Sequence, residues 1–549
     1  MKKANHYSHI LKNLRSYLGL ALVGVFTISC EKFVDINDDP NNPTEPTLNL
    51  LLPATQLSLV GHFSGSSATG GLNGGATTVS QHVASGNLNR WSQTGNTFST
   101  PWAGFYTETI PDLETIISVG TEQEEWGYVA IAKLQKAYLY SIMVDVWGDI
   151  PYSQAGGGYP NPAFENGQKI YDSLFDLIDE GLSDIGKGFS VTSSADLFFQ
   201  GSAEKWSRMG KSLKLKLLNQ IRLVDAVRAE TGIKALIADA DGLIDDNRHD
   251  FTFQYGTTVS PNARHPWFVS WYNTGRGGYV SMPLIDRLKA QDDPRLRYYI
   301  FRMDERRGLA NSTNGEGYYG RYPGDGTASP ADLNTRAIVG IYPAGGLYDN
   351  GTIPSLTEQH VYLNNDGAVS GTTNNSFKVA LFTNGDGNGA GILPLITNFM
   401  VKFIRAEAAL TLNTGEDAKQ LLKDGVEAHL TLVNAVSASN GGQTIPPANI
   451  NGFVYRIGEQ FDAADAAGKM ELLMMQKWIA LYGNGVEAYN DYRRTGLPEL
   501  ADLLAPLDEY PMRFYYSETE LTSNETVIAI RDEFQRKQQF TPVFWDVND

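Results

Sequence analysis

Helical periodicity recurs in six long segments of this 549-residue chain, and it limits the possible folds more than any other feature. In each segment apolar side chains return every three or four residues, which would bury one face of a helix against a neighbour. In the first segment Ile131, Leu134, Tyr138 and Ile142 share such a face. The six segments are residues 126–147, 170–185, 204–228, 397–412, 417–433 and 469–484. We therefore predict a mostly α-helical protein.

The lengths of these segments are typical of paired helices. Such pairs are built as tetratricopeptide-like hairpins in repeat proteins, although no signature recurs here at a fixed period. A shorter apolar helix is predicted over residues 50–59. Residues of about 64–104 are rich in Gly and Ser, and residues 250–395 combine Gly, Asn and Pro with many aromatics, which predicts loops and short strands. The expected architecture is a tetratricopeptide-like helical hairpin scaffold that carries a loop-rich portion with short strands.

The first 29 residues have the organisation of an export signal. Four basic residues and no acid occupy the first 16 positions, and the apolar run YLGLALVGVFTI follows from residue 17 to 28. That run is too short to span a bilayer, which needs about 20 apolar residues. Cys30 stands just after it and is the only cysteine, so no intrachain disulfide can form.

The residues before Cys30 resemble a bacterial lipobox, with Ser29 beside the cysteine and Thr27 where leucine is usual. The resemblance implies that residues 1–29 are a signal peptide, cleaved before Cys30, and that several acyl chains then anchor this cysteine to a membrane. Residues 30–49 are polar and rich in Pro, Asn and Asp, which predicts a flexible tether. Residues 50–549 are expected to form a single domain.

The charge of the chain excludes one class of partner. There are 44 basic and 62 acidic residues, and removal of the four basic residues of the signal takes the net charge from −18 to about −22. No cluster of Lys and Arg is present that could bind phosphates, so nucleic acid is not expected as a partner.

Searching for catalytic motifs yields only fragments without their required context. The triplet 210–212, GKS, ends like a phosphate-binding loop but lies inside a helical segment, and GEGYYG at 315–320 lacks a flanking strand and helix. The eight histidines form no H-E-x-x-H motif, and no G-x-S-x-G occurs. We predict no catalytic residue, cofactor or metal site. A carboxylate pair for glycoside cleavage stays open, because its separation is set in three dimensions.

Five stretches carry a family resemblance in the expected order. They are FVDINDDPNNP after Cys30, AYLYSIMVDVWGDIPYSQAG from Ala137, GRYPGDGTASPADLNTRAIVG from Gly320, QKWIALYGNGVEAYNDYRRTG at 476–496 and the closing VFWD from Val543. Together they resemble the SusD/RagB family of outer-membrane nutrient-binding lipoproteins, in its SusD-like branch. The resemblance covers nearly the whole mature chain. It implies four tetratricopeptide-like hairpins, binding of oligosaccharides or, in some members, peptides, and no enzymatic activity.

The same resemblance implies a location and a partner. Family members sit in the cell outer membrane by their lipid and face the outside of the cell. They act as hinged lids over a SusC-like TonB-dependent outer-membrane barrel, which imports the ligand. We therefore expect this chain to be lipid-anchored, surface-exposed and partnered with such a barrel.

Two loop-rich stretches hold the residue types that a sugar site needs. Aromatic rings bind the apolar faces of sugars, and planar polar groups replace the water contacts of sugar hydroxyls. We expect the stretches 87–106 and 265–279 to converge. The predicted ligand-binding residues are Asn89, Trp91, Trp102, Trp267, Trp271, Tyr272, Asn273, Arg276 and Tyr279. A third candidate cluster consists of Tyr318, Tyr319, Tyr322 and Asp325.

Other patterned residues are assigned structural roles. Asp149 is expected to cap a helix and Pro151 to end one, while Arg493 and Arg494 are expected to hydrogen-bond carbonyls or carboxylates. The leading functional prediction is an oligosaccharide-binding lipoprotein that passes its ligand to a transporter. A peptide-binding member of the family is the first alternative. A lipid-anchored glycoside hydrolase and a purely structural surface protein are the others.

Overall fold

The computed structural model of the chain describes residues 47–64, 71–239, 242–273, 278–302, 318–325, 337–351, 361–363, 378–380, 387–528 and 538–548. The chain divides into two units, Met1–Leu51 and Leu52–Asp549. In the first unit residues 47–51 are described, so the predicted signal peptide, Cys30 and most of the tether lie outside the described residues. The helix predicted over residues 50–59 is α2, Leu48–Ser64.

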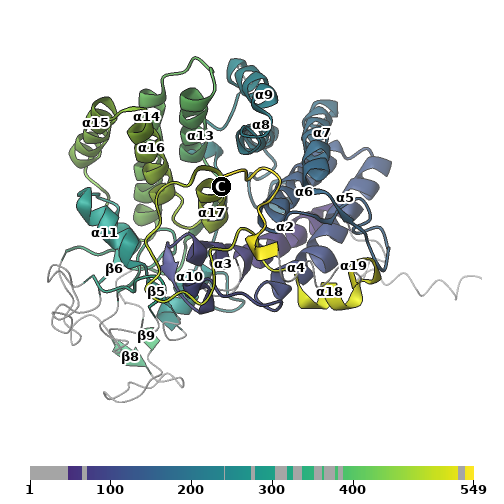
Figure 1. The fold of residues 1–549 in the computed structure, drawn as a ribbon. Coiled ribbons are helices and arrows are strands. Elements are labelled where there is room, and N and C mark those ends of the chain that lie inside the picture. The colour runs from purple at the N-terminus through teal and green to yellow at the C-terminus, as the bar shows by residue number, and fades with distance from the viewer. Residues whose placement is uncertain are drawn as a thin grey trace, which may run out of the picture. The chain divides into compact units, whose positions relative to one another are not determined.

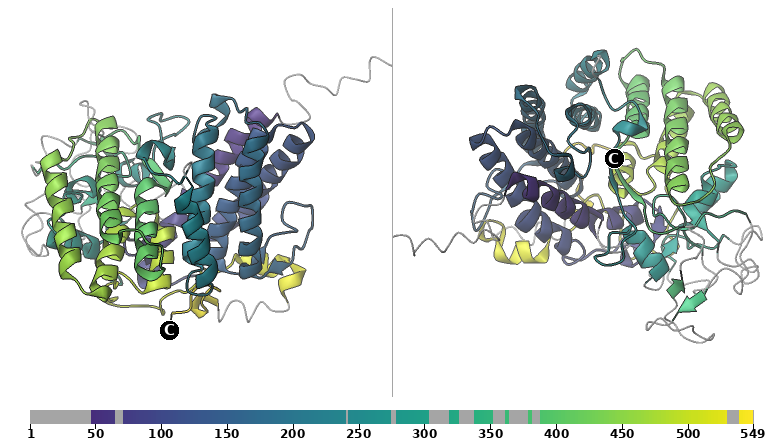
Figure 2. Two further views of the ribbon diagram at one scale, coloured as in Figure 1. Left: turned by 90° about the horizontal axis from the view of Figure 1, so that it is seen from above. Right: turned by 180° about the vertical axis from the view of Figure 1, so that it is seen from behind.

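The second unit is mostly α-helical, as predicted, and its long helices form two blocks (Figure 1). In the first block consecutive helices pack on one another, and these are α5 (Ile110–Glu122), α6 (Trp126–Trp147), α7 (Gly167–Lys187), α8 (Ala203–Gln220) and α9 (Ala226–Ala238). The second block consists of α13 (Asn398–Thr411), α14 (Ala418–Ser439), α15 (Pro447–Ala463) and α16 (Ala466–Ala480). The blocks meet where α8 packs on α13, and α17 (Gly485–Thr495) contacts both α6 and α16. Figure 2 shows the helices of the two blocks side by side.

Most of the predicted helices are confirmed, although several extend or end two to six residues from the predicted bounds, and one prediction is wrong. The segment predicted at 126–147 is α6 itself, and α13 and α14 begin after the capping side chains of Thr397 and Asp417. The segment predicted at 204–228 is not one helix. It is broken by a turn at residues 221–224, after which Asp225 accepts a hydrogen bond from the Arg228 amide and caps α9. The helices α5 and α15 were not predicted.

Short elements make up the loop-rich regions. The short helices are α3 (Gly71–Val79), α4 (Ser99–Gly104), α10 (Pro266–Phe268), α11 (Met282–Ala290), α12 (Leu296–Tyr299), α18 (Glu518–Ser523) and α19 (Glu525–Ile528). The described strands form antiparallel pairs: β1 (Val83–Ala84) with β5 (Tyr279–Val280), β2 (Ile150–Pro151) with β3 (Phe164–Glu165), β4 (Phe251–Gln254) with β10 (Ile392–Ile396), β6 (Ile300–Phe301) with β7 (Ile338–Val339), and β8 (Val361–Leu363) with β9 (Lys378–Ala380). Single turns of 3₁₀-helix lie at Asn87–Arg90, Ser193–Ala195, Asn247–His249 and Gln538–Phe540, and π-helical turns at Phe105–Thr109 and Val269–Asn273.

A buried ion network joins the helices near α17. Arg494 donates to both oxygens of Glu407, at 2.8 and 2.9 Å, and Arg222 also pairs with Glu407 at 2.8 Å. Arg493 donates to the carbonyls of Asp145 and Met512. The structural roles predicted for the two arginines of α17 are thus confirmed. Buried charges of this kind must be paired, so the network constrains how the helices pack.

The segment after α6 also has its predicted structural character. The α6 helix ends at Trp147, and Gly148 follows with a φ of 86°, a backbone conformation that glycine adopts without strain. Asp149 accepts a hydrogen bond of 2.8 Å from the amide of Gly167, the first residue of α7. Pro151 lies in β2, beyond the end of the helix. Among the described residues, no helix is both long enough and apolar enough to cross a bilayer.

Candidate functional site

A short strand pair joins the end of one predicted stretch to residues that shortly precede the other. β1 and β5 are antiparallel, with Val83 opposite Val280 and Ala84 opposite Tyr279. Two side chains approach the Gly278 backbone closely here, because an added Cβ would stand 3.1 Å from both Ser85 Oγ and a ring carbon of Trp271. The pair therefore places Tyr279, the last residue of one predicted stretch, beside residues that shortly precede the other.

The third candidate cluster runs alongside this strand pair. The Arg321 amide donates to the Val280 carbonyl and the Met282 amide donates to the Arg321 carbonyl, both at 3.0 Å. Further on, the Gly324 amide donates to the Asn89 carbonyl at 2.7 Å. The third cluster is therefore joined through backbone hydrogen bonds to Asn89 of the first stretch and to the residues that directly follow the second.

A fourth segment, which the sequence did not indicate, completes the assembly. The Leu504 amide donates to the Pro323 carbonyl at 2.9 Å, and the Leu507 amide donates to the Arg90 carbonyl at 3.0 Å. Arg90 Nε returns a hydrogen bond of 2.7 Å to the Ala505 carbonyl. We call residues 87–91, 279–281, 321–325 and 503–510 the four-loop surface. Its last segment lies far along the chain from the others, and no local pattern marks it as part of a site.

Aromatic and cationic side chains lie together on the four-loop surface. The Arg321 guanidinium stands 3.7 Å from the centroid of the Tyr279 ring. Trp91 is half-buried, with a left-handed backbone (φ 62°), and its ring meets Tyr510 edge-on at 5.3 Å. Tyr322 is 38% exposed. Tyr279 itself is buried at 8% exposure, so the aromatic faces open to a ligand on this surface are those of Trp91 and Tyr322.

Tyr322 is held in place by α11. Its hydroxyl donates a hydrogen bond of 2.8 Å to Asp286. Partial burial, with a further contribution from Asp286, raises the pKa of Tyr322 to about 12. The phenol consequently keeps its proton at neutral pH and remains a hydrogen-bond donor.

Four of the predicted ligand-binding rings point inward. Trp102, Trp267, Trp271 and Tyr272 are each at most 3% exposed. Trp102 packs edge-on against Trp147 at 5.0 Å, and Tyr272 is fixed by donating to the Val339 carbonyl and accepting from the Leu347 amide. Rings covered in this way offer no face to a ligand, and these four serve here as packing residues that support the surface.

The remaining predicted residues divide into three groups. Asn89 is buried and contributes its backbone carbonyl to the four-loop surface. Trp91 contributes a half-buried ring, whereas the Tyr279 ring is buried and packs against Arg321. In the third cluster Tyr318 and Tyr319 are buried, and Tyr322 and Asp325 reach the surface. Arg276 and the side chain of Asn273 lie outside the described residues. In the described part of the chain, no three His, Cys, Asp or Glu side chains lie close enough together to hold a metal ion.

Comparison with known proteins finds one family and many similar folds. The model of the family described as "Starch-binding associating with outer membrane" matches residues 40–517. No curated protein sequence matches the chain.

Three solved structures illustrate the likeness in fold. A chitin-binding SusD homolog from Flavobacterium johnsoniae is 19% identical, with 91% of this chain and 97% of that chain covered and a TM-score of 0.67. A SusD/RagB family protein from Bacteroides thetaiotaomicron is 19% identical, with 92% and 100% covered and a TM-score of 0.69. A SusD homolog from Bacteroides uniformis is 21% identical, with 91% and 99% covered and a TM-score of 0.64. At these identities the comparisons establish the fold.

Proposed function

The chain belongs to the SusD-like family, and on this premise we propose that it binds oligosaccharides at the four-loop surface and holds them, uncleaved, for import. The observation that carries the proposal is the convergence of four separate segments on one surface that bears Trp91, Arg321 and Tyr322. Sugar rings have apolar CH faces that pack on aromatic rings, and their hydroxyls hydrogen-bond to planar polar groups. The chitin-binding homolog supports a saccharide as the ligand class.

Rigid support from the helices favours this surface as a binding site. Residues 321–322 hydrogen-bond to Val280 of β5 and to Met282 and Asp286 of α11, and the buried Trp271 ring lies close to Gly278, next to β5. A ligand platform that is already ordered loses little conformational entropy when it binds. The proposal therefore requires no rearrangement of the described loops.

The test is removal of the exposed rings. The double variant Trp91→Ala, Tyr322→Ala should lose about tenfold in affinity for each ring that stacks on a sugar. Its melting temperature should stay close to that of the unmodified protein, because neither ring is in the core. Affinity electrophoresis in gels containing chitin oligomers, soluble starch or other neutral glycans measures retention. Tyr159→Ala, which removes a ring that is 58% exposed and outside the four-loop surface, is the matched control. Unchanged retention in the double variant contradicts the assignment.

Binding without cleavage is the second half of the proposal. Incubation of the purified mature chain with the same glycans, followed by chromatography of the products, should return the substrates at their original length. Shortened products would establish the lipid-anchored glycoside hydrolase instead.

One observation favours a peptide as the alternative ligand. Leu504 is 67% exposed and Leu507 is 55% exposed, and both stand on the four-loop surface. Exposed aliphatic side chains suit the apolar side chains of a peptide better than they suit a sugar. A library of short peptides in the same assay distinguishes the two ligand classes, and peptide retention that depends on Leu504 and Leu507 would support the alternative.

Location and partner are parts of the same proposal. We propose that acylated Cys30 anchors the chain in the outer membrane, facing outward, with residues 30–49 as the tether and a SusC-like TonB-dependent barrel as partner. The family description, "associating with outer membrane", supports this location. Cys30→Ala should move a folded, ligand-binding protein from the membrane to the soluble fraction. Affinity purification of the tagged, lipidated chain from native membranes should recover the barrel, and elution of the chain alone contradicts the partnership.

A further inference from the structure

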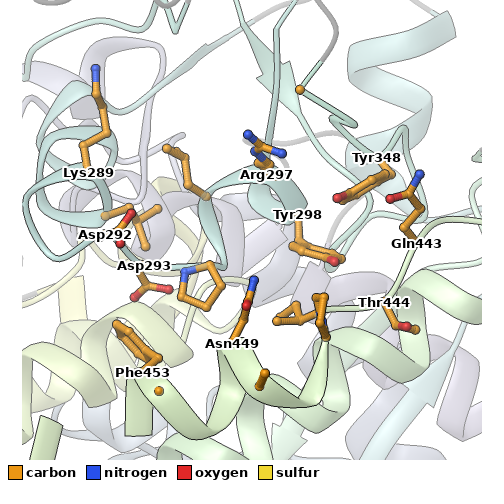
Figure 3. Close-up of a pocket in the computed structure, with 18 of the residues that line it drawn as sticks. Lys289, Asp292, Asp293, Arg297, Tyr298, Tyr348, Gln443, Thr444, Asn449 and Phe453 are labelled. Atoms are coloured by element: carbon orange, nitrogen blue, oxygen red, sulfur yellow. The ribbon is translucent and has the colours of Figure 1, made fainter. Parts of the chain in front are cut away.

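A cleft of about 920 Å³ lies outside the four-loop surface (Figure 3). One wall is formed by the end of α11 and by α12, another by residues 443–446 and the first turns of α15, and a third by residues 348–351. A volume of this size is typical of small-molecule sites. Tyr318 lines the cleft, and Tyr322, a little further along the same segment, belongs to the four-loop surface.

Two tyrosines form the aromatic part of the cleft. The ring centroids of Tyr298 and Tyr348 are 4.8 Å apart, with an interplanar angle of 47°. Figure 3 shows the amide of Asn449 pointing toward Tyr298, with Gln443 beside Tyr348. Both amide side chains are exposed and lie on the opposite wall from α12. Amides both donate and accept hydrogen bonds, as sugar hydroxyls require.

Much of the charge that lines the cleft is already paired. Arg302 binds the Asp349 carboxylate with two hydrogen bonds, of 2.6 and 2.8 Å. Asp293 is paired with the fully buried Arg295 at 2.5 Å. The exposed Asp292 stands 3.9 Å from Arg456. These carboxylates therefore contribute little net negative charge to the cleft.

Arg297 differs from these charged neighbours. It is exposed, lines the cleft, and forms no ion pair with any residue that the structure describes. Its guanidinium lies against the backbone of Gly351, where an added Cβ would stand 2.9 Å from Nη1. The first residues of α15, including Ala448, also line the cleft, so the positive end of that helix dipole faces the same space. The cleft is thus cationic on a chain whose net charge is −18.

We propose that this cleft is a second saccharide site, which binds a carboxylate-bearing sugar residue, a uronate, of an oligosaccharide. Arg297 pairs with the carboxylate, since a planar guanidinium matches the two oxygens of that group. Tyr348, which is half-buried, receives the sugar ring, while the buried Tyr298 packs against Tyr348. The amides of Gln443 and Asn449 bind the sugar hydroxyls. The inference rests on the proposed saccharide-binding function and adds an anionic ligand class to it.

The experiment measures Kd by titration calorimetry with the mature chain. The ligands are tetramers of galacturonate, glucuronate and mannuronate, each with its carboxyl-reduced neutral counterpart. At least one uronate tetramer should bind at least tenfold more tightly than its reduced form and should weaken as salt is added. Arg297→Gln should raise the Kd for that uronate at least tenfold and leave binding of neutral chitin oligomers unchanged. Arg248→Gln, which removes an 82% exposed arginine side chain elsewhere, is the matched control and should change neither.

Each outcome separates this inference from the proposed function. Equal uronate affinity in Arg297→Gln and the unmodified chain overturns the cleft assignment, as does the absence of any preference for uronate over its reduced form. Neutral glycan binding that requires Trp91 and Tyr322, without uronate binding, overturns the cleft assignment and supports the proposed function. Binding of tetraglutamate through Arg297, without uronate binding, overturns the saccharide class. Uronate binding that survives Trp91→Ala, Tyr322→Ala but is lost in Arg297→Gln supports the second site.

Discussion

The indole N–H of Trp545 donates a hydrogen bond of 3.0 Å to the carboxylate of Asp145, 400 positions earlier in the chain. Both side chains are fully buried. Asp145 also accepts from Asn490 at 2.9 Å, pairs with Lys216 at 3.2 Å and binds the Tyr171 hydroxyl. The C-terminal segment is therefore hydrogen-bonded to α6 through the Asp145 carboxylate, which also binds side chains of α7, α8 and α17.

Trp545→Phe should destabilise the protein by about 1–3 kcal/mol, because it removes one donor from a buried carboxylate while keeping most of the ring volume. Urea unfolding at neutral pH measures the change. Val547→Ala, two residues further on and 53% exposed in the native chain, is the control and should shift the free energy of unfolding by no more than about 0.5 kcal/mol. Equal stability of Trp545→Phe and the unmodified chain contradicts a stabilising role for this hydrogen bond.

Glu407→Gln should be more damaging, by about 3–5 kcal/mol, since it leaves buried cations without their carboxylate. Burial alone would raise the pKa of Glu407, but Arg494, Arg222 and Lys477 outweigh burial and hold it well below its usual value. The stability that Glu407 contributes is therefore fully present above the unfolded-state pKa of 4.5 and is lost as the pH falls below it. Chemical unfolding at pH 7 and below pH 4.5 measures the free energy of unfolding of both proteins. The difference between the variant and the unmodified chain should be smaller below pH 4.5. If this difference in unfolding free energy is the same at both pH values, the ion pairs of Glu407 are not its cause.

Buried histidines make stability depend on pH at milder acidity. Burial lowers the pKa of His82 to about 3, although its hydrogen bond to the Trp478 carbonyl raises it and Arg287 lowers it further. The unfolded chain takes up this proton near pH 6.5 and the folded chain does not, so stability is full above pH 6.5 and falls as the pH drops toward 3. Burial likewise lowers the pKa of His265 to about 3.

His82→Gln should make the plot of unfolding free energy against pH shallower by up to about 1.4 kcal/mol per pH unit. Urea titrations at several pH values between 4 and 7 give the slope for each protein. The slope is the readout, because the substitution also alters packing at every pH. Parallel plots for the two proteins would rule out His82 as a contributor.

Gly485→Ala should destabilise the contact between α3 and α17. An added Cβ would collide with the backbone nitrogen and Cα of Thr77, and Asn73 fixes this spacing by accepting from the Gly485 amide at 2.7 Å. Overpacking of this kind costs about 1–3 kcal/mol. Gly186→Ala in α7, with no atom within 4 Å of the added Cβ, should be neutral or slightly stabilising because alanine favours a helix. Thermal unfolding of the two variants compares them, and equal midpoints contradict the close approach.

Local patterns predicted most of the long helices, but not α5 or α15. The apolar repeat of 126–147 matches α6, and Thr397 and Asp417 mark the starts of α13 and α14 because their side chains accept amide hydrogen bonds. The helix predicted over 204–228 was wrong because its apolar period continues through a turn that Asp225 then caps. The glycine-rich α3 was missed, since a helix with Gly74 and Gly75 gains its stability from close packing and not from propensity.

The candidate site, like the helices, was predicted from the sequence only in part. The residue types of a saccharide surface were evident in three stretches of sequence, and backbone hydrogen bonds join the third stretch to Asn89 and to β5. Which rings face outward was not evident, because Trp91 and Trp102 have equally polar and aromatic surroundings in sequence, and only packing against Trp147 buries the latter. The contribution of residues 503–510, and the cleft around Arg297, depend on contacts between distant segments.

The sequence by itself determined the helical class, the helix starts with capping side chains, the family resemblance and the kinds of residue in the site, because each of these depends on neighbours within a few turns of the chain. Only the tertiary structure decided which aromatic rings are buried and which lie on the four-loop surface, and which charges are paired. It also decided that Trp545 hydrogen-bonds to Asp145. Those outcomes depend on burial and on long-range contacts, and a side chain's burial is set by everything that packs around it.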